Sequence, residues 1–182
     1  MSDLYISWTE YYRKTEILAA KIYQSQWAFD QIVCIARGGM RIGDVLSRIY
    51  NLPLAILATS SYGGPRGQTR GEIRLAHHLT MTTENLGSNV LLVDDLVDSG
   101  TSLDRSVAWL TEHYPDEIRE IRTAVLWYKS CSSVVPDYYV DYLSDDPWIH
   151  QPFECYEKMD PADLPHKEAI ATEIRTDSHP DK

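Results

Sequence analysis

The sequence is poor in cysteine, and its three cysteines follow no disulfide or zinc pattern. Cys34, Cys131 and Cys155 are odd in number, and none of them forms a CxxC pair. Long apolar runs are also absent: nothing approaches the roughly 20 residues that a membrane-spanning helix needs. The first residues lack the basic and then apolar layout of a secretory signal. We therefore expect a cytoplasmic protein without a membrane span.

Positive charge is scarce as well. The chain has 17 lysines and arginines against 27 aspartates and glutamates, which gives a net charge of -10, and the basic residues are scattered. Binding to nucleic acid requires clustered basic side chains that neutralise phosphates, so a general nucleic-acid surface is excluded. An anionic ligand would instead need backbone amides, a few cations and a metal ion.

What the sequence does contain is enough apolar material for one compact domain, with 43% hydrophobic residues among 182. Ser7 and Glu10 have the spacing of a capping box, which predicts a first helix over about 8–26. Beyond it, short runs rich in β-branched residues alternate with helical stretches, which predicts an α/β fold with a mainly parallel sheet. The predicted strands are 31–36, 54–58, 89–93, 121–128 and 138–142, and the further helices are 42–50 and 102–114.

Three segments do not fit this alternation. Residues 59–71 hold four of the nine glycines and predict a mobile loop that closes over a ligand. Residues 145–157 are aromatic and are predicted to be irregular. From residue 158 the composition turns polar, so we expect the folded domain to span 1–157 and a polar tail to span 158–182.

One segment has the composition of a phosphate site. The apolar run from Val90 to Val93 predicts a buried strand, and Asp94 and Asp95 follow it directly. A loop of small residues then leads into a helix, whose first N–H groups and positive end suit a phosphate. Adjacent carboxylates suit the hydroxyls of a sugar, with Mg²⁺ nearby. Asp, Ser and Gly are also ordinary turn residues, which is the simpler alternative.

This segment, VLLVDDLVDSGTSL at residues 90–103, resembles the phosphoribosyl-pyrophosphate-binding signature of type I phosphoribosyltransferases. From the first helix to about Glu154 the chain resembles the bacterial xanthine-guanine and hypoxanthine-guanine branch. The resemblance implies the type I phosphoribosyltransferase fold, with a mainly parallel sheet, flanking helices and a small hood that binds the base. It also implies a Mg²⁺-dependent homodimer or homotetramer that transfers phosphoribose from 5-phosphoribosyl pyrophosphate to N9 of guanine, xanthine or hypoxanthine in purine salvage.

The resemblance assigns roles to the donor site. It implies that Asp94 and Asp95 hold the ribose and Mg²⁺, directly or through water, and that Asp98 is the catalytic residue at the purine N7 proton. The pyrophosphate loop would be Arg37, Gly38 and Gly39, and the 5′-phosphate loop would run from Asp98 through Ser99, Gly100, Thr101 and Ser102.

The same resemblance assigns the acceptor site. It implies that Lys129 donates to the purine O6, that Trp148 stacks on the base and that the backbone of Ile149 reads the purine 2-position. It also implies that Ser60, Ser61 and Tyr62 open the flexible active-site loop. Without the resemblance, Lys129 would be read as a solvated lysine at a strand end and Trp148 as a core residue.

Three other functions remain open from the sequence. The protein could bind phosphoribosyl pyrophosphate as a regulator without catalysis, although an acidic chain of this length offers little room for a nucleic-acid surface. It could use adenine, orotate or uracil as the acceptor. It could be a metal hydrolase that uses His77 and His78, although adjacent histidines on a strand point to opposite faces.

Overall fold

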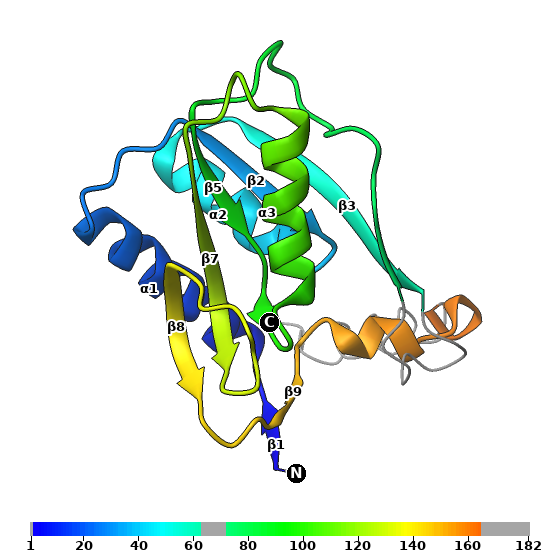
Figure 1. Ribbon diagram of the computed structural model, residues 1–182. Helices are drawn as coiled ribbons and strands as arrows, with labels where there is room; N and C mark the ends of the chain where they lie inside the picture. The colour runs from blue at the N-terminus through cyan, green and yellow to red at the C-terminus, as the bar shows by residue number, and fades with distance from the viewer. Residues whose placement is uncertain (1, 63–71, 165–182) are drawn as a thin grey trace, which may run out of the picture.

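The structure, a computed structural model, describes residues 2–62 and 72–164, and its centre is a seven-stranded sheet (Figure 1). The strands lie in the order β4-β3-β2-β5-β7-β6, and β8 also pairs with β7. All neighbours are parallel except β3 and β4. The strands are β2 Gln31–Ala36, β3 Leu54–Tyr62, β4 Glu72–Leu75, β5 Asn89–Val93, β6 Leu96–Val97, β7 Glu120–Lys129 and β8 Tyr138–Leu143.

Helices cover both faces of this sheet. The helices α1 (Trp8–Gln24) and α2 (Met40–Tyr50) lie on one face and α3 (Thr101–His113) lies on the other (Figure 1). Side chains of a strand alternate between the two faces of the sheet, so Ile32 packs with α1 and α2, whereas Val33 packs with α3. The predicted α/β architecture is confirmed.

Local signals explain where the helices begin and end. The Ser7 hydroxyl accepts a hydrogen bond of 3.1 Å from the Glu10 N–H, which caps α1 as the spacing predicted. Asn51 ends α2 in the left-handed conformation, with φ of 53°. The helix α3 begins at Thr101, one residue before the predicted start.

The connections create a point of divergence in the middle of the sheet. The neighbouring strands β2 and β5 lead away in opposite directions, β2 through α2 to β3 and β5 through α3 to β7. Because α2 and α3 lie on opposite faces, the carboxyl ends of β2 and β5 border a crevice, where ligands of open α/β sheets bind. The predicted pyrophosphate loop follows β2, and the predicted acidic segment follows β5.

Two predictions about the loops were wrong. Residues 59–62 do not belong to a loop but extend β3, where they pair antiparallel with β4 from Thr59↔Leu75 to Tyr62↔Glu72. The rest of the predicted loop, 63–71, lies outside the described residues. His77 and His78 lie in a bend after β4, not on a strand.

The segment 145–157, predicted to be irregular, contains regular structure. Its strand β9 (Trp148–His150) pairs in parallel with β1 (Asp3–Tyr5), which forms a second, two-stranded sheet. Two short 3₁₀ helices follow, η1 (Glu154–Lys158) and η2 (Pro161–Asp163). The end of the predicted tail, 165–182, lies outside the described residues. In the part of the chain that is described, no helix is long and apolar enough to cross a membrane.

Candidate active site

The loop after β2 approaches the end of β5 closely because it contains two glycines. A Cβ atom on Gly38 would collide with the Asp95 carboxylate, and one on Gly39 would collide with the Val93 carbonyl. Glycine at both positions therefore brings the backbone that follows Arg37 against the acidic segment. The Gly39 N–H is already used, because it donates to the Ile35 carbonyl at 2.8 Å.

Asp94 and Asp95 lie where β5 ends, in the crevice. The Asp94 N–H still donates to the Ala124 carbonyl of β7 at 3.1 Å, and the Asp94 carboxylate accepts the Asp95 N–H at 2.9 Å. Burial raises the pKa of both carboxyls, and the charge of Asp95 raises the pKa of Asp94 further. The two side chains therefore form an acidic pair that a cation would stabilise.

Gln151 contacts this acidic pair, although no role was predicted for it from the sequence. Its Nε2 donates a hydrogen bond to Asp95 Oδ2, which opposes the rise that burial causes in the pKa of Asp95. The Leu96 N–H donates to the other carboxylate oxygen at 2.8 Å. Gln151 is buried, and its Oε1 has no partner among the described residues. The carboxylate of Asp95 is thus held in one orientation from two sides.

The predicted phosphate loop encloses a cavity of about 230 Å³. Gly100, the N-cap residue of α3, has a φ of 85°, which is left-handed, and the Thr101 N–H donates to the Ser99 hydroxyl at 3.4 Å. The Ser99 carbonyl accepts hydrogen bonds from the N–H and the hydroxyl of Ser133, at 3.2 and 3.1 Å, which fix the loop. Four of the five predicted phosphate-loop residues line this cavity, together with the acidic pair: Asp98, Ser99, Gly100 and Ser102.

The structure joins a predicted catalytic residue to a predicted base-binding residue. Lys129, buried at the end of β7, lies with its Nζ 3.2 Å from Asp98 Oδ1. The Asp98 side chain is exposed. The ion pair therefore anchors the carboxylate at the mouth of the phosphate loop, next to a buried cation.

The predicted base-binding residues Trp148 and Ile149 lie on β9, at the edge of the site. The Trp148 side chain is exposed, whereas that of Ile149 is buried in the core. The Trp148 N–H donates to the Ser2 carbonyl at 2.9 Å, and the His150 carbonyl accepts the Ile6 N–H at 3.0 Å. Backbone bonds of a strand alternate in direction, so the Ile149 N–H and C=O face away from β1. Neither residue lines the cavity at the phosphate loop or the larger cavity between the loop after β2 and η1.

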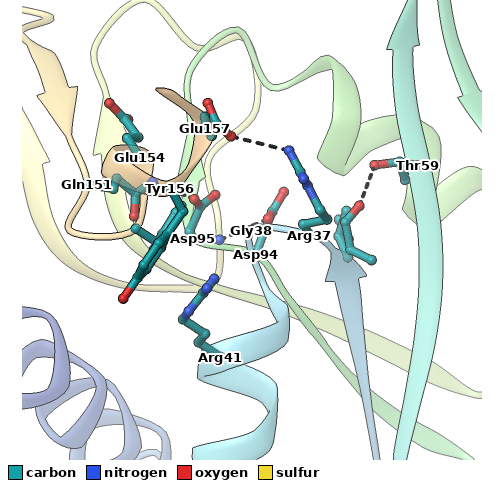
Figure 2. A pocket seen from close by; sticks show the side chains of 13 residues that line it. Arg37, Gly38, Arg41, Thr59, Asp94, Asp95, Gln151, Glu154, Tyr156 and Glu157 are labelled. Atoms are coloured by element: carbon teal, nitrogen blue, oxygen red, sulfur yellow. Dashed lines mark hydrogen bonds and ion pairs between the residues drawn. The ribbon is translucent and has the colours of Figure 1, made fainter. Parts of the chain in front are cut away.

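A larger cavity of about 470 Å³ lies between the loop after β2, the acidic pair and η1 (Figure 2). Thr59 of β3 contributes to its wall and donates to the Ala36 carbonyl at 3.2 Å. Glu157 of η1 lies 3.2 Å from the Arg37 guanidinium. Several polar lining residues were not predicted from the sequence: Arg41, Thr59, Gln151, Glu154, Tyr156 and Glu157.

Of the predicted flexible-loop residues, the structure places Ser60, Ser61 and Tyr62 at the end of β3. Ser60 is exposed and pairs with Arg74 of β4. Ser60 lines neither cavity.

The acidic pair fits a Mg²⁺ ion that arrives with a phosphate ligand. Among the described residues, no three His, Cys, Asp or Glu side chains lie close enough to hold a metal ion by themselves. Mg²⁺ commonly binds through one or two carboxylates and keeps waters and substrate phosphates as its other ligands. Asp94 and Asp95 meet that need, because both cavities open onto them.

Comparison with known proteins agrees with this geometry. The family model described as phosphoribosyl transferase domain matches residues 7–158. The chain belongs to the phosphoribosyltransferase family. The matched region of this phosphoribosyltransferase runs from the cap of α1 to the end of η1, so it includes every candidate site residue named above. The resemblance and the fold class predicted from residues 90–103 are confirmed.

Individual relatives of this phosphoribosyltransferase cover most of its length. It is 27% identical over 155 residues to the xanthine-guanine phosphoribosyltransferase of Idiomarina loihiensis, covering 85% of this chain and 88% of the relative. It is 29% identical over 150 residues to that of Gluconobacter oxydans, covering 82% and 83%. A crystal structure of a purine phosphoribosyltransferase from Pyrococcus horikoshii superposes with a TM-score of 0.65 at 28% identity, covering 84% and 94%.

Proposed function

We propose that this protein transfers the 5-phosphoribosyl group from 5-phosphoribosyl pyrophosphate to N9 of a 6-oxopurine, with release of pyrophosphate, in purine salvage. The observation that carries the proposal is the pair of cavities that share Asp94 and Asp95 at the divergence of β2 and β5. The larger cavity is lined by the loop that contains Arg37, and the smaller one lies at the amino end of α3. A donor that carries phosphate groups at both ends of its ribose requires two such anion sites. The names of the relatives support a purine acceptor.

In this proposal each part of the site holds one part of the donor. The small cavity under the amino end of α3 takes the 5′-phosphate, because the N-cap residue Gly100 has no side chain to occupy the first N–H groups of this helix. Asp94 and Asp95 accept the ribose hydroxyls. Arg37, with the backbone of Gly38, takes the pyrophosphate, and Gly39 lets this loop lie against the end of β5.

The same residues suit the charges that develop during transfer. The bond between C1 and the pyrophosphate oxygen breaks as purine N9 bonds to C1, and the sugar gains oxocarbenium character. The carboxylates of Asp94 and Asp95 face the positive charge on the sugar. Arg37 faces the negative charge on the leaving group, which is the arrangement that lowers the barrier most.

Asp98 and Lys129 act on the purine in this proposal. As N9 gains its bond to C1, the proton on N7 must leave, and Asp98 accepts it. Lys129 donates to O6 of the base. The ion pair of 3.2 Å between these two residues supports the assignment, because it fixes the spacing of a proton acceptor and a donor. Trp148 stacks on the ring, and Ile149 presents its free backbone groups to the 2-position.

The acidic pair would hold Mg²⁺ together with the donor. When bound, Mg²⁺ supplies positive charge to the pyrophosphate and the ribose hydroxyls. Asp94 and Asp95, which line both cavities, orient the donor between them.

We further infer that the enzyme works in the cytoplasm as a homodimer or homotetramer. The family resemblance supports this inference. Light scattering on the eluting peak of a size-exclusion column checks it: a mass near twice or four times 20.8 kDa is expected, and a monomer at micromolar concentration contradicts it.

The proposed reaction is tested directly with the purified protein. The protein, Mg²⁺ and 5-phosphoribosyl pyrophosphate are incubated separately with guanine, hypoxanthine, xanthine, adenine, orotate and uracil, and pyrophosphate and nucleotide are measured. Turnover with 6-oxopurines alone is expected. Turnover only with another base would overturn the acceptor assignment, and donor binding without any turnover would favour a regulatory protein.

A further inference from the structure

The larger cavity carries more negative than positive side chains, although the proposed leaving group is an anion. Its lining includes four carboxylates and two arginines: Asp94, Asp95, Glu154 and Glu157 against Arg37 and Arg41. Arg37 is engaged, because Glu157 lies 3.2 Å from its guanidinium. While that ion pair is closed, Arg41 is therefore the arginine of this lining that can attract an anion.

Arg41 lies four residues after Arg37 in the sequence. It occupies the first turn of α2, whose N-cap residue is Gly39, and it is partly buried. Figure 2 shows its side chain rising from α2 toward Asp94 and Asp95. The site thus receives a second cation from the helix that follows its pyrophosphate loop.

The side chain of Arg41 contacts aromatic rings. Its guanidinium carbon lies 4.4 Å from the ring centre of Phe153 and 5.7 Å from that of Trp8. In residues 2–62 and 72–164, Arg41 forms no ion pair with a carboxylate. Aromatic rings attract the π face of a guanidinium, and its five N–H donors on the edge stay available.

Arg48, on the same helix, provides the contrast. It is exposed, and it pairs with Asp44 at 3.0 Å. An arginine held by aromatic rings at the wall of a cavity, with no carboxylate bound, is instead placed for an anionic ligand. A purely structural side chain there could be Met or Leu, which pack on aromatic rings without the cost of burying a charge.

We propose that Arg41 binds the pyrophosphate group of the donor and of the released product, as a second arginine beside Arg37. This proposal rests on the proposed function. Arg41 meets the pyrophosphate with its N–H edge while Phe153 and Trp8 hold its π face, so the side chain is oriented before the ligand arrives. Arg37 joins when its ion pair with Glu157 exchanges for a phosphate oxygen.

The test measures the binding of magnesium pyrophosphate to the full chain by isothermal titration calorimetry, for the wild type, Arg41→Met, Arg41→Gln and Arg48→Met. Loss of charge-assisted hydrogen bonds to one arginine should weaken pyrophosphate binding by about 10- to 100-fold in both Arg41 variants. Arg48→Met, which removes the same charge from the same helix, should bind like the wild type.

Steady-state kinetics separates binding of the pyrophosphate from packing of the aromatic residues. Arg41→Met should raise the KM of the donor by a similar factor and leave the KM of the purine within about twofold, because binding of the base does not involve Arg41. Equal increases in both KM values would indicate general damage to the site and overturn the proposal. Arg41→Gln decides the matter if Arg41→Met melts below the assay temperature.

Two different outcomes would separate the role of Arg41 from the proposed function. Wild-type transfer with undiminished pyrophosphate binding by a folded Arg41 variant would overturn the role of Arg41 alone. A wild type that neither binds magnesium pyrophosphate nor transfers phosphoribose to any base would overturn the proposed function as well.

Discussion

The ion pair of Asp98 and Lys129 brings together two side chains that are 31 positions apart in the sequence. If Asp98 takes the N7 proton, Asp98→Ala should lower turnover by roughly 10²- to 10⁴-fold and change donor affinity little, because the 5′-phosphate is held by backbone N–H groups. Measuring kcat and the KM of the donor checks this. Asp44→Ala, at an exposed position of α2, is the control; unchanged turnover in Asp98→Ala would remove Asp98 from the mechanism.

Asp94 links catalysis to stability. Burial, and after it the charge of Asp95, raises the pKa of Asp94 well above its ordinary value of 3.8. The folded protein therefore keeps this proton at pH values where the unfolded chain has lost it. By proton linkage, the contribution of Asp94 to stability is largest at low pH and declines as the pH rises from about 3.8 through the raised pKa.

Asp94→Asn removes this dependence, since an amide does not titrate. At pH 7 and without Mg²⁺ or donor, we expect the variant to gain about 1–2 kcal/mol in the free energy of unfolding and to lose transfer activity. Urea unfolding at several pH values measures the gain, which should shrink as the pH falls. A variant that is less stable than the wild type at pH 7 would contradict the expectation.

The sequence identified the site residues that lie in one continuous motif. Asp94, Asp95 and the phosphate loop could be predicted because one segment supplies a strand end, two acids and a helix start. Gln151 and Glu157 could not be, because each reaches the site through a contact with a residue more than 50 positions away, Asp95 or Arg37. Arg41 gave a weak signal only, its spacing of four residues from Arg37.

The short helix η1 supplies side chains to the wall of the larger cavity. Its Glu157 pairs with Arg37 across the opening, and both side chains are exposed, so the pair contributes at most about 1 kcal/mol. Glu157→Gln should free Arg37 and lower the KM of the donor, by up to about fivefold. Glu112→Gln, at an exposed position of α3, removes the same charge outside the cavity and should leave this KM unchanged. An equal KM in both variants would mean that Glu157 does not compete with the donor.

The errors in the predicted elements have a physical cause. Residues 59–62 were assigned to a loop because glycines and polar residues follow them, yet β4 supplies an antiparallel partner that extends β3. The strands β1 and β9 have three residues each, which is too short for an alternating pattern, and they pair across more than 140 positions. Longer elements with a clear period were predicted to within a few residues.

Over the whole molecule, the alternation of strands and helices predicted the fold class but not the strand order. The order matters, because only the neighbouring positions of β2 and β5 create the crevice. No pattern within one segment encodes which strands become neighbours. The resemblance in residues 90–103 supplied what the periodicity could not.

The burial of the acidic pair predicts how the whole fold responds to ligands. A donor that arrives with Mg²⁺ compensates Asp94 and Asp95, so it should stabilise the protein by about 2.7 kcal/mol at 100 times its Kd. A purine alone leaves the pair uncompensated, so at the same concentration it should bind more weakly and stabilise the protein much less. Differential scanning fluorimetry with donor and Mg²⁺, donor alone and guanine alone checks this; equal shifts for guanine alone would contradict it.

The pairing of β1 with β9 also sets an order of assembly during synthesis. The ribosome releases β1 first, but β9 emerges only after β2, β5 and the phosphate loop have left the exit tunnel. Trp148 and Ile149 can therefore take their places only when nearly all of the domain has been translated. A nascent chain stalled before Trp148 would lack this acceptor edge and also Gln151 and Glu157 in the wall of the larger cavity, so neither substrate has a complete site until translation is nearly over.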